Sequence, residues 1–193
     1  NFIKSFLSPV SRLAPSSTLN IGDKISTVVH NNSNIFLRAE YDVSWSDQPQ
    51  DNILCLPDTV RLIKILSCLE EDKIDLVIKE NCITYNNNNN RFKYHLFDDS
   101  LQSKNSFDFT KIDAELSDKK IQNVDSYTTL VADKFEGDDL DYELILDVEL
   151  FRLISTLSFE TATIYINNEY KMLMMKLDIH ESHLTFVSTS YKN

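Results

Sequence analysis

The sequence RLIKILS at positions 61–67 returns as RLISTLS at positions 152–158, with the same residue at five of the seven places. Each copy follows a short apolar segment and an aspartate, Asp58 or Asp147, and Asp58 is expected to cap a helix or to lie in its first turn. Each copy also precedes segments with the alternation of β-strands. Because the order of elements is the same around both copies, the sequence predicts two related domains.

The boundaries of these domains are expected at residues 1–102 and 103–193. We expect an α+β fold in which each domain has an antiparallel β-sheet with amphipathic helices on one face. Apolar residues at spacings of three and four predict helices over 2–13, 59–69 and 148–157. Pro9 is expected to kink the first helix or delay its start.

Short alternating segments between polar turns predict the strands of both domains. Residues 108–120 are expected to form a strand followed by a short helix. The remaining expected strands are Ser17–Ile21, Lys24–His30, Ile35–Tyr41, Asn52–Leu56, Ile74–Ile78, Cys82–Tyr85, Arg91–Phe97, Tyr127–Ala132, Leu140–Leu146, Thr163–Ile166, Lys171–Leu177 and Leu184–Thr189.

Composition excludes several classes of function. The chain has 193 residues, 42% of them hydrophobic, and only two glycines, Gly22 and Gly137. Two isolated glycines cannot form a dinucleotide-binding turn, a phosphate-binding loop or a nucleophile elbow. The three cysteines form no C-x-x-C pair, which favours free thiols in a reducing cytoplasm. No apolar run is long enough for a membrane span, and residues 1–14 do not have the pattern of a signal peptide.

His180 and His183 are the best candidates for a metal site. On a strand, side chains three positions apart point to opposite faces, so these two imidazoles would converge only in a turn. The acidic cluster at 138–143 lacks the spacing of a calcium loop and reads as a solvated turn. No nucleophile stands beside a base, so we expect neither an enzyme, nor a resident metal, nor a cofactor.

Basic residues on the predicted helices form the remaining pattern. The chain has a net charge of −11. An acidic protein is repelled by DNA at long range, yet it can hold DNA if its cations gather on one surface. The polar sides of the three predicted helices carry Lys4, Arg12, Arg61, Lys64 and Arg152.

Four stretches resemble the DNA polymerase sliding clamps, or processivity factors, of T4-like phages. They are the amphipathic segment Asn1–Leu13, the sequence LNIGDKIST at 19–27, LPDTVRLIKILS at 56–67 and RFKYHLFDD at 91–99. The likeness covers residues 1–100 well and residues 140–190 more loosely.

The resemblance implies a bacteriophage protein in the cytoplasm of an infected cell. Clamps of this type are homotrimers, and each subunit gives two domains to a ring around duplex DNA. Helices line the hole, so Lys4, Arg12, Arg61, Lys64 and Arg152 would face DNA, with Lys111, Lys119 and Lys120 as weaker candidates. The implied partners are a DNA polymerase, a clamp-loader ATPase and short peptides bound in an apolar groove whose residues the sequence does not identify.

The second half departs from the pattern of a clamp domain. Such a domain has an early and a late helix, and only the late one is clear, at 148–157. Either residues 112–120 form a shortened early helix, or the second domain has no early helix. The alternatives to a ring are therefore a monomeric clamp-fold accessory protein, acting in replication or late transcription, and a small metal-dependent enzyme that uses His180 and His183.

Overall fold

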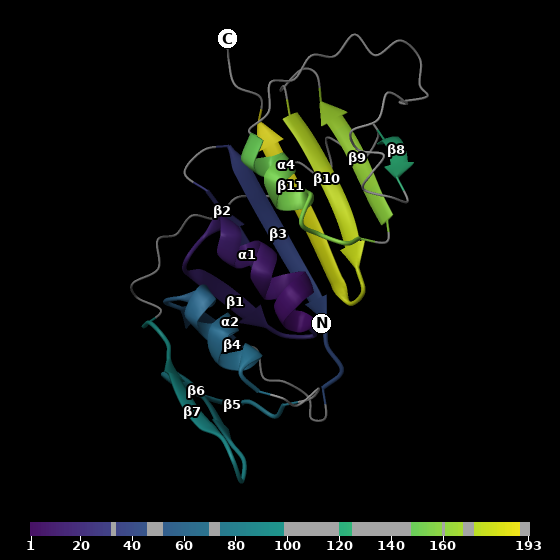
Figure 1. Cartoon of the computed structure of the whole chain (residues 1–193). Coiled ribbons are helices and arrows are strands. Elements are labelled where there is room, and N and C mark those ends of the chain that lie inside the picture. Colours follow the sequence, from purple (N-terminus) through teal and green to yellow (C-terminus); the bar gives the residue numbers. More distant parts are fainter. Residues whose placement is uncertain are drawn as a thin grey trace.

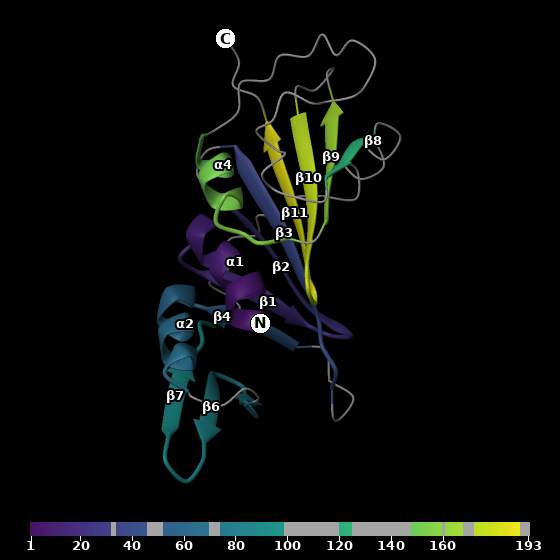
Figure 2. The same cartoon turned by 45° about the vertical axis from the view of Figure 1, so that its right-hand side comes forward.

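The computed structural model describes residues 1–31, 34–45, 52–69, 74–98, 120–124, 148–159, 161–167 and 172–189. An eight-stranded antiparallel sheet forms its centre, in the order β4-β1-β2-β3-β11-β10-β9-β8. All the described helices cover one face of this sheet (Figures 1 and 2). Its strands are β1 (Ser17–Ile21), β2 (Lys24–His30), β3 (Ile35–Asp42), β4 (Asn52–Leu56), β8 (Lys120–Val124), β9 (Thr161–Asn167), β10 (Met172–Ile179) and β11 (Ser182–Thr189).

The pairing of β3 with β11 joins the two halves of the chain, and we call it the seam. It runs from the pair Tyr41–Ser182 to the pair Ile35–Ser188. Side chains alternate between the two faces of a strand. Ile35 and Leu37 of β3 are buried in the core under the helices, whereas Phe36 belongs to a separate cluster on the opposite face.

The N-terminal helical segment forms as predicted, although it is not one regular helix. A π-helical turn, η1 (Ile3–Leu7), leads directly into α1 (Ser8–Leu13), and Pro9 lies in the first turn of α1. The Ser8 N–H donates to the Ile3 carbonyl, so α1 continues η1, and Pro9, which has no N–H to donate, lies where the π-helical turn changes to an α-helix. Phe6, Leu7 and Val10 are completely buried against the sheet, which confirms the predicted apolar face.

The repeated sequence forms corresponding parts of two helices, α2 (Thr59–Ser67) and α4 (Val148–Ile154). Leu62 and Leu153 occupy equivalent places in the repeat, and both are buried. Helix α2 begins where the Asp58 carboxylate accepts a hydrogen bond from the backbone of Arg61 at 2.8 Å, as predicted for its cap. Both helices end two or three residues earlier than their periodicity indicates.

A three-stranded sheet packs at the start of α2 and contains β5 (Val77–Lys79), β6 (Cys82–Asn86) and β7 (Arg91–His95). Strands β5 and β7 are shorter than predicted. The buried Tyr94 holds this sheet to α2, since its hydroxyl accepts from the Asp58 N–H at 3.0 Å and donates to the Asp58 carbonyl at 2.8 Å. Burial of this hydroxyl raises the pKa of Tyr94.

Some predicted elements lie outside the described residues. They are the strands at 127–132 and 140–146, and most of the segment 108–120. The expectation of a helix ending at Lys120 is wrong at that residue, because Lys120 begins strand β8 at the edge of the large sheet. None of the described helices is long and apolar enough to cross a membrane.

Candidate nucleic-acid interface

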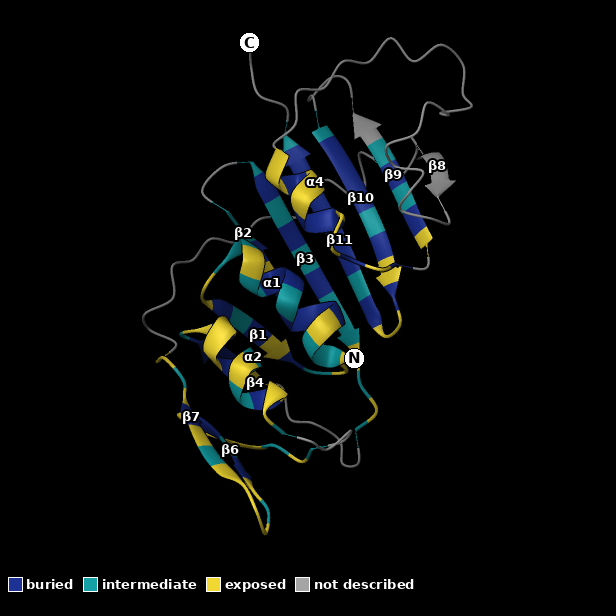
Figure 3. Cartoon of the chain, in the orientation of Figure 1, coloured by how far each residue is buried: buried dark blue, intermediate teal, exposed yellow. Residues whose placement is uncertain are grey.

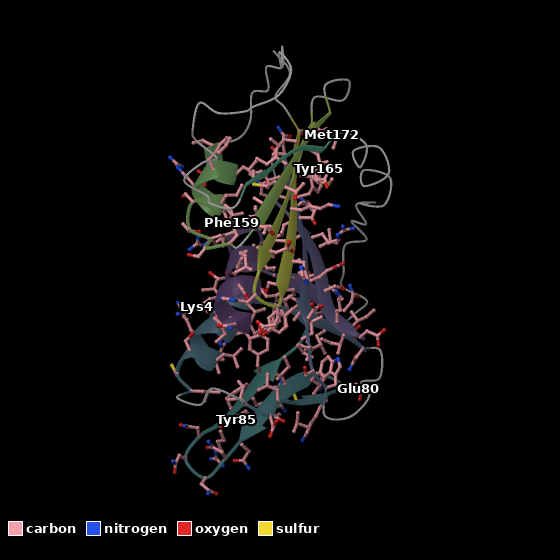
Figure 4. The ribbon with its side chains drawn as sticks, turned by 90° about the vertical axis from the view of Figure 1, so that its right-hand side faces the viewer. Lys4, Glu80, Tyr85, Phe159, Tyr165 and Met172 are labelled. Carbon is pink, nitrogen blue, oxygen red and sulfur yellow. The ribbon has the colours of Figure 1, made fainter. Side chains whose placement is uncertain are left out.

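The helical layer carries the five cationic residues selected from the sequence. Lys4 lies in η1, Arg12 in α1, Arg61 and Lys64 in α2, and Arg152 in α4, and all five are exposed. The apolar stripes of these helices face the sheet, so their polar positions face away from it (Figure 3). Figure 4 shows Lys4 on the helix side of the sheet.

The charge of this layer has the opposite sign to the charge of the chain. The described helices contain five basic residues and a single acidic one, Glu149. The whole chain has 30 acidic and 19 basic residues. The described helices are therefore positive against an acidic background, which suits contact with a polyanion.

Arg12 and Arg152 line the same hollow, although they come from opposite halves of the chain. The hollow has a volume of about 330 Å³ and also contacts Leu13, Asn31 and Leu153. The Arg12 guanidinium donates to the Thr156 hydroxyl just beyond α4, and Arg152 forms an ion pair with Glu149. Two guanidinium groups beside one hollow provide the planar donors that bind phosphate oxygens well.

Three weaker candidates are not brought to this face by the described structure. Lys111 and Lys119 lie outside the described residues. Lys120 is on strand β8 rather than on a helix, at the far edge of the sheet.

The opposite face of the sheet carries an apolar cluster that the sequence did not reveal. Met174 and Val187 are fully buried there, and Phe36, Tyr165 and Met172 pack against them. Strand pairing aligns Phe36 with Val187, Val187 with Met174, and Met174 with Tyr165, so the cluster crosses the seam. We call these five residues the outer cluster. The run Met172–Met175 was its signal, because apolar residues at consecutive positions supply both faces of a strand.

The two histidines considered for a metal site have different surroundings. His180 occupies the turn between β10 and β11 with a positive φ of 52°, while the His183 side chain bonds to Asp178 and Asp42. Within the described ranges, no three His, Cys, Asp or Glu side chains are grouped as metal ligands would be. The hypothesis of a metal-dependent enzyme therefore has no support from these two residues.

No protein-family model matches this sequence, and no curated protein matches it. Its structure is similar to solved sliding clamps. Against A. fulgidus PCNA bound to the C-terminal region of FEN-1, the TM-score is 0.72 at 10% identity, over 100% of this chain and 96% of that one. Against the Pseudomonas aeruginosa DNA polymerase III subunit beta, the TM-score is 0.63 at 13% identity, over 100% of this chain and 63% of that one.

A Helicobacter pylori beta clamp bound to a DNA ligase peptide gives a TM-score of 0.57 at 13% identity, over 97% of this chain and 63% of that one. The chain thus matches less than two thirds of the length of these bacterial clamps and nearly all of the archaeal one. At such identities the similarity concerns the fold. This chain has the α+β fold of the sliding clamps, as its sequence predicted.

Proposed function

We propose that this protein is a DNA sliding clamp of the T4-like phage type, a non-enzymatic ring that encircles duplex DNA and tethers a replicative polymerase. The observation that carries the proposal is the charge of the described helices, five basic residues and one acidic, in a chain of net charge −11. In the clamp fold of this chain these helices form one layer, which would line the hole.

This distribution of charge suits a protein that slides. Lysine and arginine contacts to phosphates are independent of base sequence and weaken as salt rises. A ring needs only weak contacts, because its attachment to DNA is topological. The acidic remainder of the chain would keep DNA away from the other surfaces by repulsion.

The edges of the two described sheets offer a route to a ring. Strand β8 ends the large sheet, and β7 lies at an edge of the small sheet, so each pairs with a single described strand. Exposed strand edges present unpaired backbone donors and acceptors. Pairing of β7 of one copy with β8 of the next would be head-to-tail, the type of contact that generates closed rings. Three copies, each with clamp-like domains 1–102 and 103–193, would give a ring of six domains.

Partner proteins would dock on the side away from DNA. The A. fulgidus PCNA structure holds the C-terminal region of FEN-1, and the H. pylori beta clamp holds a DNA ligase peptide. We place the equivalent peptide site of this chain at the rim of the outer cluster, around the half-buried Phe36, Tyr165 and Met172. The expected users are the DNA polymerase and an ATP-driven clamp loader.

The alternative is a monomeric accessory protein with the clamp fold. The observation that favours it is the uneven share of helices, since among the described residues only α4 comes from the second half. Native mass separates the two functions. Light scattering over a range of concentrations should give about 67 kDa for a trimer of 22.3 kDa chains. A monomer at every concentration would support the accessory protein instead.

Topological binding is tested on nicked circular DNA loaded with the clamp by its loader. Cutting the circle should release the protein, because a ring slides off a free end. Arg61→Glu with Lys64→Glu should reduce loading or polymerase processivity, whereas Lys79→Glu, an exposed cation of the small sheet, should not. Retention that is insensitive to cutting would contradict the ring.

A further inference from the structure

His183 joins two carboxylates that come from opposite halves of the chain. Its Nδ1 lies 2.6 Å from Oδ1 of Asp178 on β10, and its Nε2 lies 3.1 Å from Oδ2 of Asp42 at the end of β3. Both carboxylates have further partners. Lys24 Nζ on β2 is 2.8 Å from the second oxygen of Asp42, and the Thr161 hydroxyl on β9 donates to Asp178 at 2.9 Å. One imidazole is thus at the centre of a chain of contacts that crosses five strands.

This network lies at the end of the seam. The Asp42 backbone N–H donates to the Glu181 carbonyl in the turn between β10 and β11, which extends the pairing of β3 beyond the last residue pair. On the helix side of the same end, the buried hydroxyls of Ser5 and Ser182 share a hydrogen bond of 2.7 Å. The seam is therefore tied at this end on both faces. The serine tie is neutral, whereas the His183 tie contains groups that titrate.

The charge state of His183 determines how many of these bonds can form. A neutral imidazole has one N–H and donates to a single carboxylate, whereas an imidazolium has two and donates to both. When His183 is neutral, one of its nitrogens presents a lone pair to a carboxylate. Deprotonation of His183 therefore replaces one N–H···carboxylate hydrogen bond with a repulsion between the nitrogen lone pair and the carboxylate.

The surroundings of His183 favour its cationic form. Glu40 on β3 is its register partner across the seam, Glu181 and His180 form the adjacent turn, and Lys24 is bound to Asp42. The hydrogen bond to Asp178, followed by that to Asp42, raises the pKa of His183 above its ordinary 6.5. The groups nearest to His183 are thus mainly acidic, while the cations Arg38 on β3 and Lys176 on β10, the register partners of Thr185, lie two positions along on the same face.

We propose that His183 is a protonation-dependent clasp that fastens the end of β3 to the β10–β11 hairpin, and so fastens the two halves of the chain at their seam. With His183 protonated, the clasp is closed and both carboxylates are bound. With His183 neutral, it is open at one carboxylate, and the seam end is held by its backbone bonds and by the serine tie. This inference is independent of DNA binding.

The Asp42 amide is the direct reporter, because its N–H crosses the seam end to Glu181. Hydrogen exchange of the full-length protein, corrected for intrinsic rates, should show stronger protection of this amide at pH 6 than at pH 8.5. His183→Gln should reduce the protection at pH 6 and abolish its pH dependence. His95→Gln removes a histidine from β7, in the other sheet, and should leave the dependence unchanged.

A titration of His183 by NMR supplies an independent measurement that does not depend on a glutamine variant folding. The wild-type imidazole should titrate above pH 6.5, and both Asp178→Asn and Asp42→Asn should shift its titration to lower pH. Asp178→Asn should have the larger effect because its oxygen is closer. Titration at or below pH 6.5, or equal Asp42 protection at both pH values in the wild type, would overturn the proposal.

Discussion

Arg12 and Thr156 are separated by 144 positions in the sequence, yet the guanidinium of Arg12 donates a hydrogen bond to the hydroxyl of Thr156. This bond joins the end of α1 to the segment that follows α4. It places Arg12 at the same hollow as Arg152, so cations from both halves of the chain act on one region of the helical layer. The predictions for DNA binding follow from this convergence.

Removing both arginines of the hollow should weaken DNA binding and its salt dependence together. Each lost phosphate contact lowers the slope of log affinity against log salt by about 0.9 to 1. We therefore expect Arg12→Ala with Arg152→Ala to reduce the slope by about 2 if each arginine contacts one phosphate. Fluorescence anisotropy with duplex DNA over a salt series measures this slope. Lys79→Ala is the control, and an unchanged slope in the double variant would place the DNA elsewhere.

Neutralising the acid of the helical layer should have the opposite effect. Glu149 is ion-paired with Arg152 and competes with phosphate for that guanidinium. Glu149→Gln retains the size of the side chain and removes its charge. The affinity of this variant for duplex DNA should therefore be higher than that of the wild type. The same anisotropy series tests this, with Glu80→Gln of the small sheet as the matched control. Equal gains in both variants would indicate only a change of net charge.

The repeated helices should be sensitive to truncation at equivalent positions. Leu62 is 3% exposed and Leu153 is 5% exposed, so each leaves a cavity when shortened. Leu62→Ala and Leu153→Ala should each lower the free energy of unfolding by about 2 to 5 kcal/mol. Val148→Ala, at a residue that is 57% exposed, should change it by no more than about 0.5 kcal/mol. Urea titration followed by circular dichroism provides the comparison.

Tyr94→Phe should loosen the small sheet from α2. The substitution leaves the ring in place but removes the hydroxyl that bonds to both the N–H and the carbonyl of Asp58. The Asp58 carbonyl still accepts from the Leu62 N–H at 3.1 Å, so the Asp58 N–H is the group that loses a hydrogen bond, at a cost of about 1 kcal/mol. Tyr85→Phe removes a hydroxyl that accepts from Asn87 within the hairpin of the small sheet. This substitution should lower the stability of the sheet less than Tyr94→Phe does. Hydrogen exchange should show the Tyr94 effect in β5, β6 and β7 before the large sheet.

The His183 clasp should add stability only within a window of pH. The pKa of His183 is raised above 6.5, so its contribution is complete below that pH and disappears as pH rises through the folded value. The contacts with Lys24 and then His183 lower the pKa of Asp42 below its ordinary 3.8. The stabilisation from the ionised Asp42 carboxylate is therefore lost as the pH falls through this lowered pKa. The unfolding midpoint of the wild type, minus that of His183→Gln, should therefore be largest between about pH 4 and 6.5. The effect should be modest and screened by salt, because the His183 side chain is 39% exposed. A difference that is constant from pH 4 to 9 would contradict the clasp.

Local patterns in the sequence were sufficient to predict most individual elements. The strands Ser17–Ile21, Lys24–His30 and Asn52–Leu56 have the predicted bounds, and Asp58 caps α2 as expected. Alternation, helical spacing and capping depend on residues close in sequence, so they can be read without knowledge of the partners. The ends of the helices were less accurate, because apolar residues beyond Ser67 and Ile154 continue the helical spacing after the helix itself has ended.

The sequence by itself determined the α+β class, the repeated helix and the five cations of the helical layer, because each rests on a period or a residue type within a short window. Only the tertiary structure decided that β3 pairs with β11, that Arg12 reaches Thr156 and that His183 bridges Asp42 and Asp178. These contacts join residues more than a hundred positions apart or depend on a strand register that several partners could satisfy. The physical reason is that burial of one continuous apolar face over both halves selects the register, and that selection involves the whole chain at once.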